Sequence, residues 1–169
     1  MLTTPSALTP EQVHRHLLRA DAVARRAMVM GRHPFGALLV APDGETVLAE
    51  QGNIDTVHHA EATLARTVSL TYPADYLWQC TLITTFEPCA MCTGTVYWAH
   101  IGHIVYGASE EALLALTGSH PENPTLSLPC RDVLARGQKP LRVTGPVPEV
   151  ADQLVNTHRD FWRNPAPHG

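Results

Sequence analysis

Two short segments carry side chains that could together bind a metal ion. His59-Ala60-Glu61 is an H-x-E motif, and Pro88-Cys89-Ala90-Met91-Cys92 is a P-C-x-x-C motif. The sequence around each motif predicts the start of a helix, and residues three apart on a helix lie on the same face. Both thiolates can therefore reach one tetrahedral ion, and a helix N-terminus stabilises their negative charge.

One histidine and two cysteines leave the fourth position of a tetrahedral zinc site open, which is typical of catalytic zinc. We therefore expect one Zn²⁺ per chain at His59, Cys89 and Cys92. Zinc lowers the pKa of a bound water toward about 7, so hydroxide becomes available near neutral pH. Glu61 lies two residues beyond the histidine and is the expected catalytic general acid and base, which takes up the proton of that water and passes it on.

Two other interpretations give these residues no catalytic role. A redox C-x-x-C pair beside an unrelated histidine is one, but it leaves Glu61 unexplained. A structural zinc site is the other, and it needs a fourth ligand, for which Cys80 and Cys130 are the candidates. His58 also competes with His59 as a ligand, and the H-x-E spacing favours His59.

The composition predicts a single domain over residues 1–169, with a core from about 9 to 145, a C-terminal helix from about 148 to 163 and a frayed tail at 164–169. Hydrophobic residues make up 44% of the 169 residues, enough to build one core. No apolar run approaches the ~20 residues needed to span a bilayer. The N-terminal residues show no secretory signal, so we expect a cytoplasmic protein without a membrane partner.

The charge balance favours a small-molecule partner. Twelve Lys and Arg against sixteen Asp and Glu give a formal net charge of −4, and the basic residues are scattered along the chain. A nucleic-acid-binding surface normally shows a basic excess or stripe, so a nucleic-acid partner is not expected.

Apolar periodicity, turn residues and prolines predict helices that alternate with strands. We expect helices at 9–30, 58–69, 88–99, 110–116 and 149–162, and strands at 35–41, 46–51, 80–86, 102–106 and 141–144. The first two strands form a hairpin, and the later β-α-β run implies parallel strands with right-handed crossovers. The expected fold is therefore α/β, a three-layer α/β/α sandwich around a mixed sheet of about five strands. Residues 117–129, with three prolines, are expected to form a surface loop.

Three segments make the chain resemble the cytidine/deoxycytidylate deaminase superfamily of zinc-dependent nucleobase and nucleoside deaminases. Thr85–Cys92 is similar to the E-P-C-x-M-C core of one branch, and H-x-E with P-C-x-x-C is the signature of zinc deaminases. Phe35–Val40 is similar to the family's first strand. Gly94–Ala99 is most similar to the bacterial guanine deaminase group. The resemblance implies a cytidine deaminase-like fold.

The resemblance implies hydrolytic deamination of an amino-bearing nucleobase or nucleoside with release of ammonia. Tyr97-Trp98-Ala99 favours guanine or another aminopurine, and hence purine metabolism, while cytosine, other pyrimidines and s-triazine amines stay open. A tRNA adenosine deaminase with the same core is a further alternative. So is a non-catalytic, zinc-stabilised binding module, although such a module would have no use for Glu61. Because members of this branch are usually dimers, the resemblance also implies a homodimer.

The resemblance further implies a set of substrate contacts. The expected substrate-binding residues are Asn53, Ala60, Glu87, Pro88, Phe35, Gly36, Trp98 and Trp162. Asn53 lies closer to the H-x-E motif than the substrate-binding asparagine of the family does, so a turn residue is the alternative there. Trp98 could pack on the core instead. Trp162 follows Asp160 and Phe161 in a segment that could close over the pocket or simply dock on the core.

Overall fold

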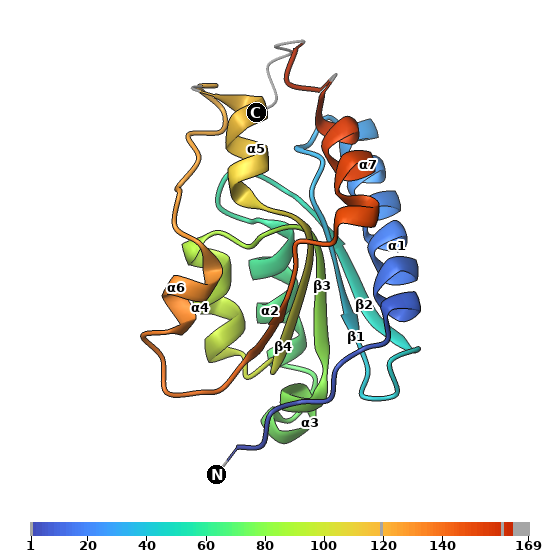
Figure 1. Ribbon diagram of the computed structural model, residues 1–169, viewed down its shortest axis with the longest axis vertical. Coiled ribbons are helices and arrows are strands. Elements are labelled where there is room, and N and C mark those ends of the chain that lie inside the picture. Colours follow the sequence, from blue (N-terminus) through green and yellow to red (C-terminus); the bar gives the residue numbers. More distant parts are fainter. Residues whose placement is uncertain (1, 119, 160, 164–169) are drawn as a thin grey trace.

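The computed structural model describes residues 2–118, 120–159 and 161–163 (Figure 1). Its helices are α1 (Pro10–Val29), α2 (Ala60–Ser69), α3 (Ala74–Gln79), α4 (Ala90–Trp98), α5 (Glu110–Thr117), α6 (Cys130–Leu134) and α7 (Pro148–Arg159). Its strands are β1 (Gly36–Val40), β2 (Val47–Gly52), β3 (Thr81–Phe86), β4 (His103–Ala108) and β5 (Arg142–Thr144). None of the described helices is both long and apolar enough to cross a membrane.

The five strands form one mixed sheet in the order β2-β1-β3-β4-β5. β1 runs antiparallel to both β2 and β3, whereas β3, β4 and β5 are parallel to one another. The β1–β2 hairpin turns at Asp43-Gly44. There the Asp43 carboxylate accepts hydrogen bonds from the amides of Glu45 and Thr46, and Gly44 takes a positive φ of 74°. The predicted mixed sheet of about five strands is confirmed.

Helices cover both faces of this sheet, which confirms the predicted three-layer arrangement. α1 and α7 pack on one face, while α2, α4 and α6 lie on the other (Figure 1). Because successive side chains of a strand point to opposite faces, the central strands supply two cores. Leu38 and Ile83 belong to the core under α1 and α7, whereas Leu39 and Leu82 belong to the core under α2 and α4.

The sequence prediction omitted two short helices, α3 and α6. They have 6 and 5 residues, too few to show a helical repeat of apolar positions. α7 ends at Arg159, three residues before the predicted end at residue 162. Asp160 and the predicted frayed tail at 164–169 lie outside the described residues. The organisation of residues 1–169 as one domain stays a prediction.

Candidate active site

The N-termini of α2 and α4 bring the two predicted motifs together, because the two helices pack against each other on one face of the sheet. His59 is the N-cap residue of α2 and Cys89 that of α4, and neither side chain caps its own helix. His59 Nδ1 lies 3.6 Å from Cys89 Sγ and 3.5 Å from Cys92 Sγ. The three predicted ligands therefore form one group, with all ligand atoms within 4.8 Å of one another.

These distances fit a zinc ion. With a Zn–S distance of about 2.3 Å and a Zn–N distance of about 2.05 Å, a tetrahedral angle places the nitrogen about 3.6 Å from each sulfur. Cys80 and Cys130, the alternative fourth ligands, do not belong to the group, and the Cys80 thiol donates instead to the Tyr76 carbonyl. Within the described ranges the group offers three protein ligands, so a zinc ion bound here would keep one position open.

A negative charge is favoured at Cys89. Hydrogen bonds that the Cys89 sulfur accepts from Cys92 and from His59 lower the pKa of Cys89 to about 4 in spite of its burial. The hydrogen bond between Cys92 and Cys89, and then burial, raises the pKa of Cys92. The hydrogen bond between His59 and Cys89 raises the pKa of His59. Cys89 therefore supplies one thiolate readily, and Cys92 must give up its proton when a metal binds.

Glu61 lies in the first turn of α2, directly beside the ligand group. Its Oε2 is 3.6 Å from Cys92 Sγ, and its Oε1 accepts a hydrogen bond of 2.8 Å from the Thr84 hydroxyl on β3. Burial raises the pKa of Glu61. Sequence reasoning did not identify Thr84, because a threonine inside an apolar strand carries no motif. Thr84 fixes one carboxylate oxygen, which leaves the other turned toward the ligand group.

His59, Cys89 and Glu61 line a cavity of about 480 Å³. Two aromatic rings, Phe35 and Phe86, form part of its wall and meet edge to face with centroids 5.8 Å apart. Residues 121–126, from the predicted surface loop, line the cavity as well. We call this segment the roof. The volume lies within the range of small-molecule sites.

Glu87 and Glu110 connect the roof to the rest of the site. One oxygen of the Glu87 carboxylate accepts from the Cys130 amide at 2.9 Å, and the other from the Glu110 amide at 3.2 Å. The two amides flank the segment that contains the roof. The pKa of Glu110 is raised to about 8, first by burial and then by the negative charges of Cys89, Glu87 and Glu61. Neither anchoring function was predicted from the sequence.

Only some of the remaining predicted substrate-binding residues line the cavity. Phe35 and Glu87 line the cavity, whereas Gly36, Ala60 and Pro88 are not among its lining residues. A substrate contact at these three residues stays a prediction, and Gly36 also has a packing role, because a Cβ there would lie 2.3 Å from the Ala20 carbonyl oxygen of α1. The close approach of β1 to α1 therefore requires glycine.

Asn53 lies beside the main cavity rather than in it. It lines a smaller cavity of about 180 Å³, which shares the lining residues His33 and Thr56 with the main one. Its Nδ2 donates to the Asp55 carbonyl at 3.1 Å, and its buried Oδ1 has no hydrogen-bond partner among the described residues. A substrate contact at Asn53 stays a prediction. His58 bonds the Asp55 carboxylate at 2.9 Å and is not in the ligand group.

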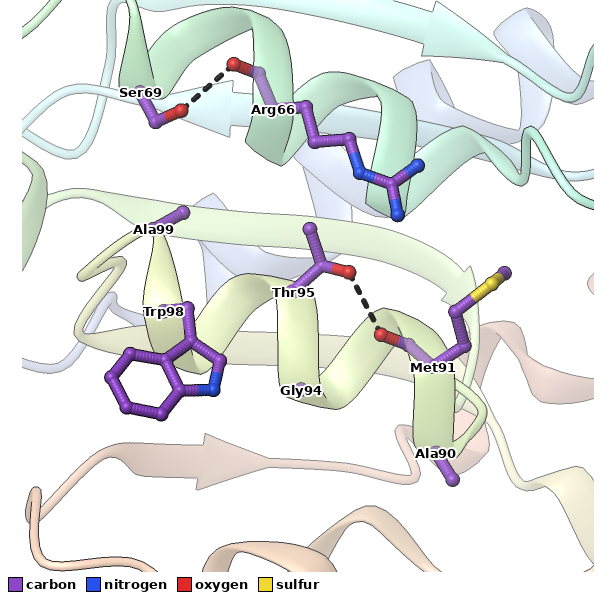
Figure 2. Close-up of a pocket in the computed structure, with 8 residues that line it drawn as sticks. All are labelled: Arg66, Ser69, Ala90, Met91, Gly94, Thr95, Trp98 and Ala99. Atoms are coloured by element: carbon purple, nitrogen blue, oxygen red, sulfur yellow. Dashed lines mark hydrogen bonds between the residues drawn. The ribbon is translucent and has the colours of Figure 1, made fainter.

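The structure does not bring the two predicted tryptophans into the metal cavity. Trp98 is 75% exposed and lines a separate groove between α2 and α4, together with Arg66 and Met91 (Figure 2). Trp162 is buried, packs 4.8 Å from the His33 ring, and donates from Nε1 to His158 Nδ1 at 3.0 Å. Trp162 therefore does not line the cavity itself, although its neighbour His33 does.

Comparison with known proteins agrees with this geometry. The family described as "Cytidine and deoxycytidylate deaminase zinc-binding region" matches residues 10–108, which include α1 to β4 and both motifs. The chain belongs to this deaminase family. The family is described as zinc-binding, and the His59, Cys89 and Cys92 group lies within the matched residues.

The relatives differ in substrate. A probable cytosine deaminase of Schizosaccharomyces pombe is 33% identical over 150 residues, covering 87% of this chain and 90% of that protein. The guanine deaminase of Bacillus subtilis is 39% identical over 79 residues, covering 44% and 50%. tRNA-specific adenosine deaminases are also among the relatives. A solved guanine deaminase of Nitrosomonas europaea shares the fold, with a TM-score of 0.68 at 21% identity over 94% of this chain and 87% of that one.

Proposed function

We propose that this deaminase hydrolyses the exocyclic amine of a free nucleobase, with guanine or another aminopurine as the first candidate and one catalytic zinc ion per chain. The observation that carries this proposal is Glu61. A purely structural metal site has no use for a buried carboxylate that lines the same cavity as two of the ligands, His59 and Cys89. For the same reason we do not favour a non-catalytic binding module.

The described side chains divide the reaction between them. His59, Cys89 and Cys92 would hold the zinc ion, which when bound would supply the Lewis acidity that makes water a nucleophile near neutral pH. Glu61 removes the proton of the attacking water and returns protons to the ring nitrogen and the departing amine. Phe35 and Phe86 offer apolar faces to a planar ring, and the roof separates it from solvent.

Cytosine is the second candidate, and one specific observation favours it. The S. pombe relative named as a probable cytosine deaminase aligns with 87% of this chain, whereas the B. subtilis guanine deaminase aligns with 44%. The Tyr97-Trp98-Ala99 triplet supports guanine by resemblance only, because Trp98 lies outside the metal cavity. An s-triazine amine fits the same chemistry.

A tRNA substrate fits the charges less well. α7 carries Glu149 and Asp152 against Arg159, and the whole chain has a formal net charge of −4. A polynucleotide would meet no basic excess there. Homodimeric assembly and a role in purine metabolism stay predictions that rest on the resemblance, and the cytoplasmic location stays a prediction from the sequence.

The test is ammonia release from guanine, cytosine, their nucleosides and a folded tRNA. Glu61→Gln should keep zinc and fold but lower turnover about 10²- to 10⁴-fold, the usual contribution of a general acid and base. The matched control is Glu111→Gln, since Glu111 is exposed on α5 and lies outside the cavity. Full activity of Glu61→Gln would refute the mechanism, and activity on tRNA alone would refute the substrate class.

A further inference from the structure

Glu110 is a buried carboxylate of the cavity to which no role in the reaction has been given above. It is the first residue of α5, and Ser109 caps that helix by accepting from the Ala112 amide at 3.1 Å. This rigid helix start places the Glu110 side chain in the lining of the cavity, where it is only 7% exposed. The position is therefore set by the fold and not by a mobile surface side chain.

One oxygen of this carboxylate lacks a partner. The Leu128 amide, which donates to the Leu126 carbonyl at 2.9 Å, also lies close enough to the Glu110 carboxylate to stabilise it, but Oε2 is buried and has no hydrogen-bond partner in the described part of the chain. A buried polar atom without a hydrogen bond costs free energy, so such an atom calls for an explanation, of which a bound ligand is one. Glu110 lines the cavity, so a molecule bound there lies next to this carboxylate.

The other acidic side chains of the cavity are already engaged. Both oxygens of Glu87 accept from backbone amides. Glu61 is held by Thr84 and faces the ligand group, and Glu122 lies 3.5 Å from His33 Nε2. Among these carboxylates, Glu110 is the one with a buried oxygen that has no hydrogen-bond partner in the described part of the chain.

We propose that Glu110 is a specificity-determining residue, whose Oε2 accepts a hydrogen bond from an N–H of the heterocyclic substrate. This proposal rests on the proposed function for the class of ligand. It selects bases that present a ring N–H or a second amino group to this acceptor. A ring with only a lone pair or a methyl group at that point leaves Oε2 unsatisfied and is rejected.

A purely structural role for Glu110 would act through Leu128 and the roof. Glu110→Gln separates the two roles, because the amide oxygen of glutamine can still accept from Leu128 while its NH₂ group replaces the free acceptor by a donor. Glu110→Ala removes both functions. Glu111→Gln removes a neighbouring charge from α5 outside the cavity and is the matched control.

The experiment measures binding of labelled guanine and cytosine by equilibrium dialysis. The zinc-loaded Glu61→Gln protein serves as the parent, so that no base is consumed. We expect the parent to bind at least one base and Glu110→Gln in that background to weaken this binding about 10- to 100-fold, as when a buried hydrogen-bonding group loses its partner. Glu111→Gln should bind as the parent does. In the active enzyme, Glu110→Gln should raise KM more than it lowers kcat.

Two results would overturn the proposal. If Glu110→Gln binds as tightly as the parent while Glu110→Ala loses affinity, Glu110 acts through the roof alone and the proposed function is untouched. If the parent binds neither base, and the wild-type protein releases ammonia from neither, the proposed function and the role of Glu110 fall together. Retained zinc content and an unchanged melting temperature in Glu110→Gln keep misfolding from imitating a loss of binding.

Discussion

His103 makes a sharp prediction about acid stability. This side chain of β4 is 1% exposed and lies between two threonines of neighbouring strands, 3.2 Å from Thr81 Oγ1 on β3 and 2.9 Å from Thr144 Oγ1 on β5. Burial, and then the positive charge of Arg142, lowers its pKa to about 4. The folded protein therefore holds His103 neutral at pH values where an unfolded chain would protonate it.

The magnitude follows from the difference between the two pKa values. A histidine in the unfolded chain titrates near about 6.5, and each unit of difference is worth about 1.36 kcal/mol. Above about pH 6.5 the neutral state of His103 costs no stability. As the pH falls from about 6.5 toward 4, the free energy of unfolding decreases because only the unfolded chain can protonate this histidine. At pH 5 the loss is about 2 kcal/mol, and below pH 4 it approaches about 3 kcal/mol.

Urea unfolding of the zinc-loaded wild type and of His103→Gln, each at pH 7.5 and at pH 5, measures this loss. Glutamine keeps hydrogen-bonding groups for both threonines but does not titrate. We expect the free energy of unfolding of the wild type to fall by about 2 kcal/mol more than that of the variant. Since both proteins contain the same metal site and the same buried His158, the pH dependence of those groups cancels in the difference.

The reasoning fails if the wild type and His103→Gln lose the same free energy between the two pH values. That outcome would mean that His103 protonates without penalty in the folded state, so that the three-strand contact does not exclude its charged form. A lower stability of the variant at both pH values would not matter, because only the difference in slope carries the prediction.

Three further changes test the site and its support. Cys92→Ser should abolish stoichiometric zinc binding, measured by metal analysis after dialysis, and should lower the melting temperature of the purified protein by several degrees; retention of full zinc content would contradict the ligand assignment. Gly36→Ala should destabilise the fold by about 3 kcal/mol or more in chemical denaturation because its Cβ meets the α1 backbone, whereas Gly94→Ala, which meets nothing within 4 Å, should change stability by about 1 kcal/mol or less. Glu87→Gln should leave zinc bound but raise proteolytic cleavage within residues 118–129. The reason is that a neutral side-chain amide cannot accept from both the Glu110 and the Cys130 backbone amides as the carboxylate does. Unchanged cleavage would show that Glu87 does not anchor the roof.

Much of the fold could be predicted because it depends on local patterns. The amphipathic repeat of α1 and the apolar runs of β1 and β3 follow directly from the period of a helix or strand. The metal group could be predicted for a related reason, since both motifs lie at helix starts, where spacing alone places side chains on one face. The helices α3 and α6 are too short to produce such a signal.

The cavity wall was less predictable because it depends on contacts between distant segments. The hydrogen bond between Thr84 and Glu61 joins residues that are 23 positions apart in the sequence, and the one between Glu87 and Cys130 joins residues 43 positions apart. No spacing rule connects such pairs. Trp98 illustrates the opposite case, in which an aromatic residue inside a family-like helix was expected at the substrate and lines a groove other than the metal cavity. Similarity of a segment predicted its helix and not the direction of each side chain.

Hydrogen exchange at the two backbone amides that Glu87 binds can report how often the roof opens. Glu87 lies two residues before Cys89, so the roof and a metal ligand are attached to the same strand end. The amides of Glu110 and Cys130 can exchange their hydrogens with solvent only when these bonds open. Their exchange rates therefore report the free energy of roof opening. Zinc, by fixing Cys89, should slow both amides together, which makes access to the cavity sensitive to the metal beneath it.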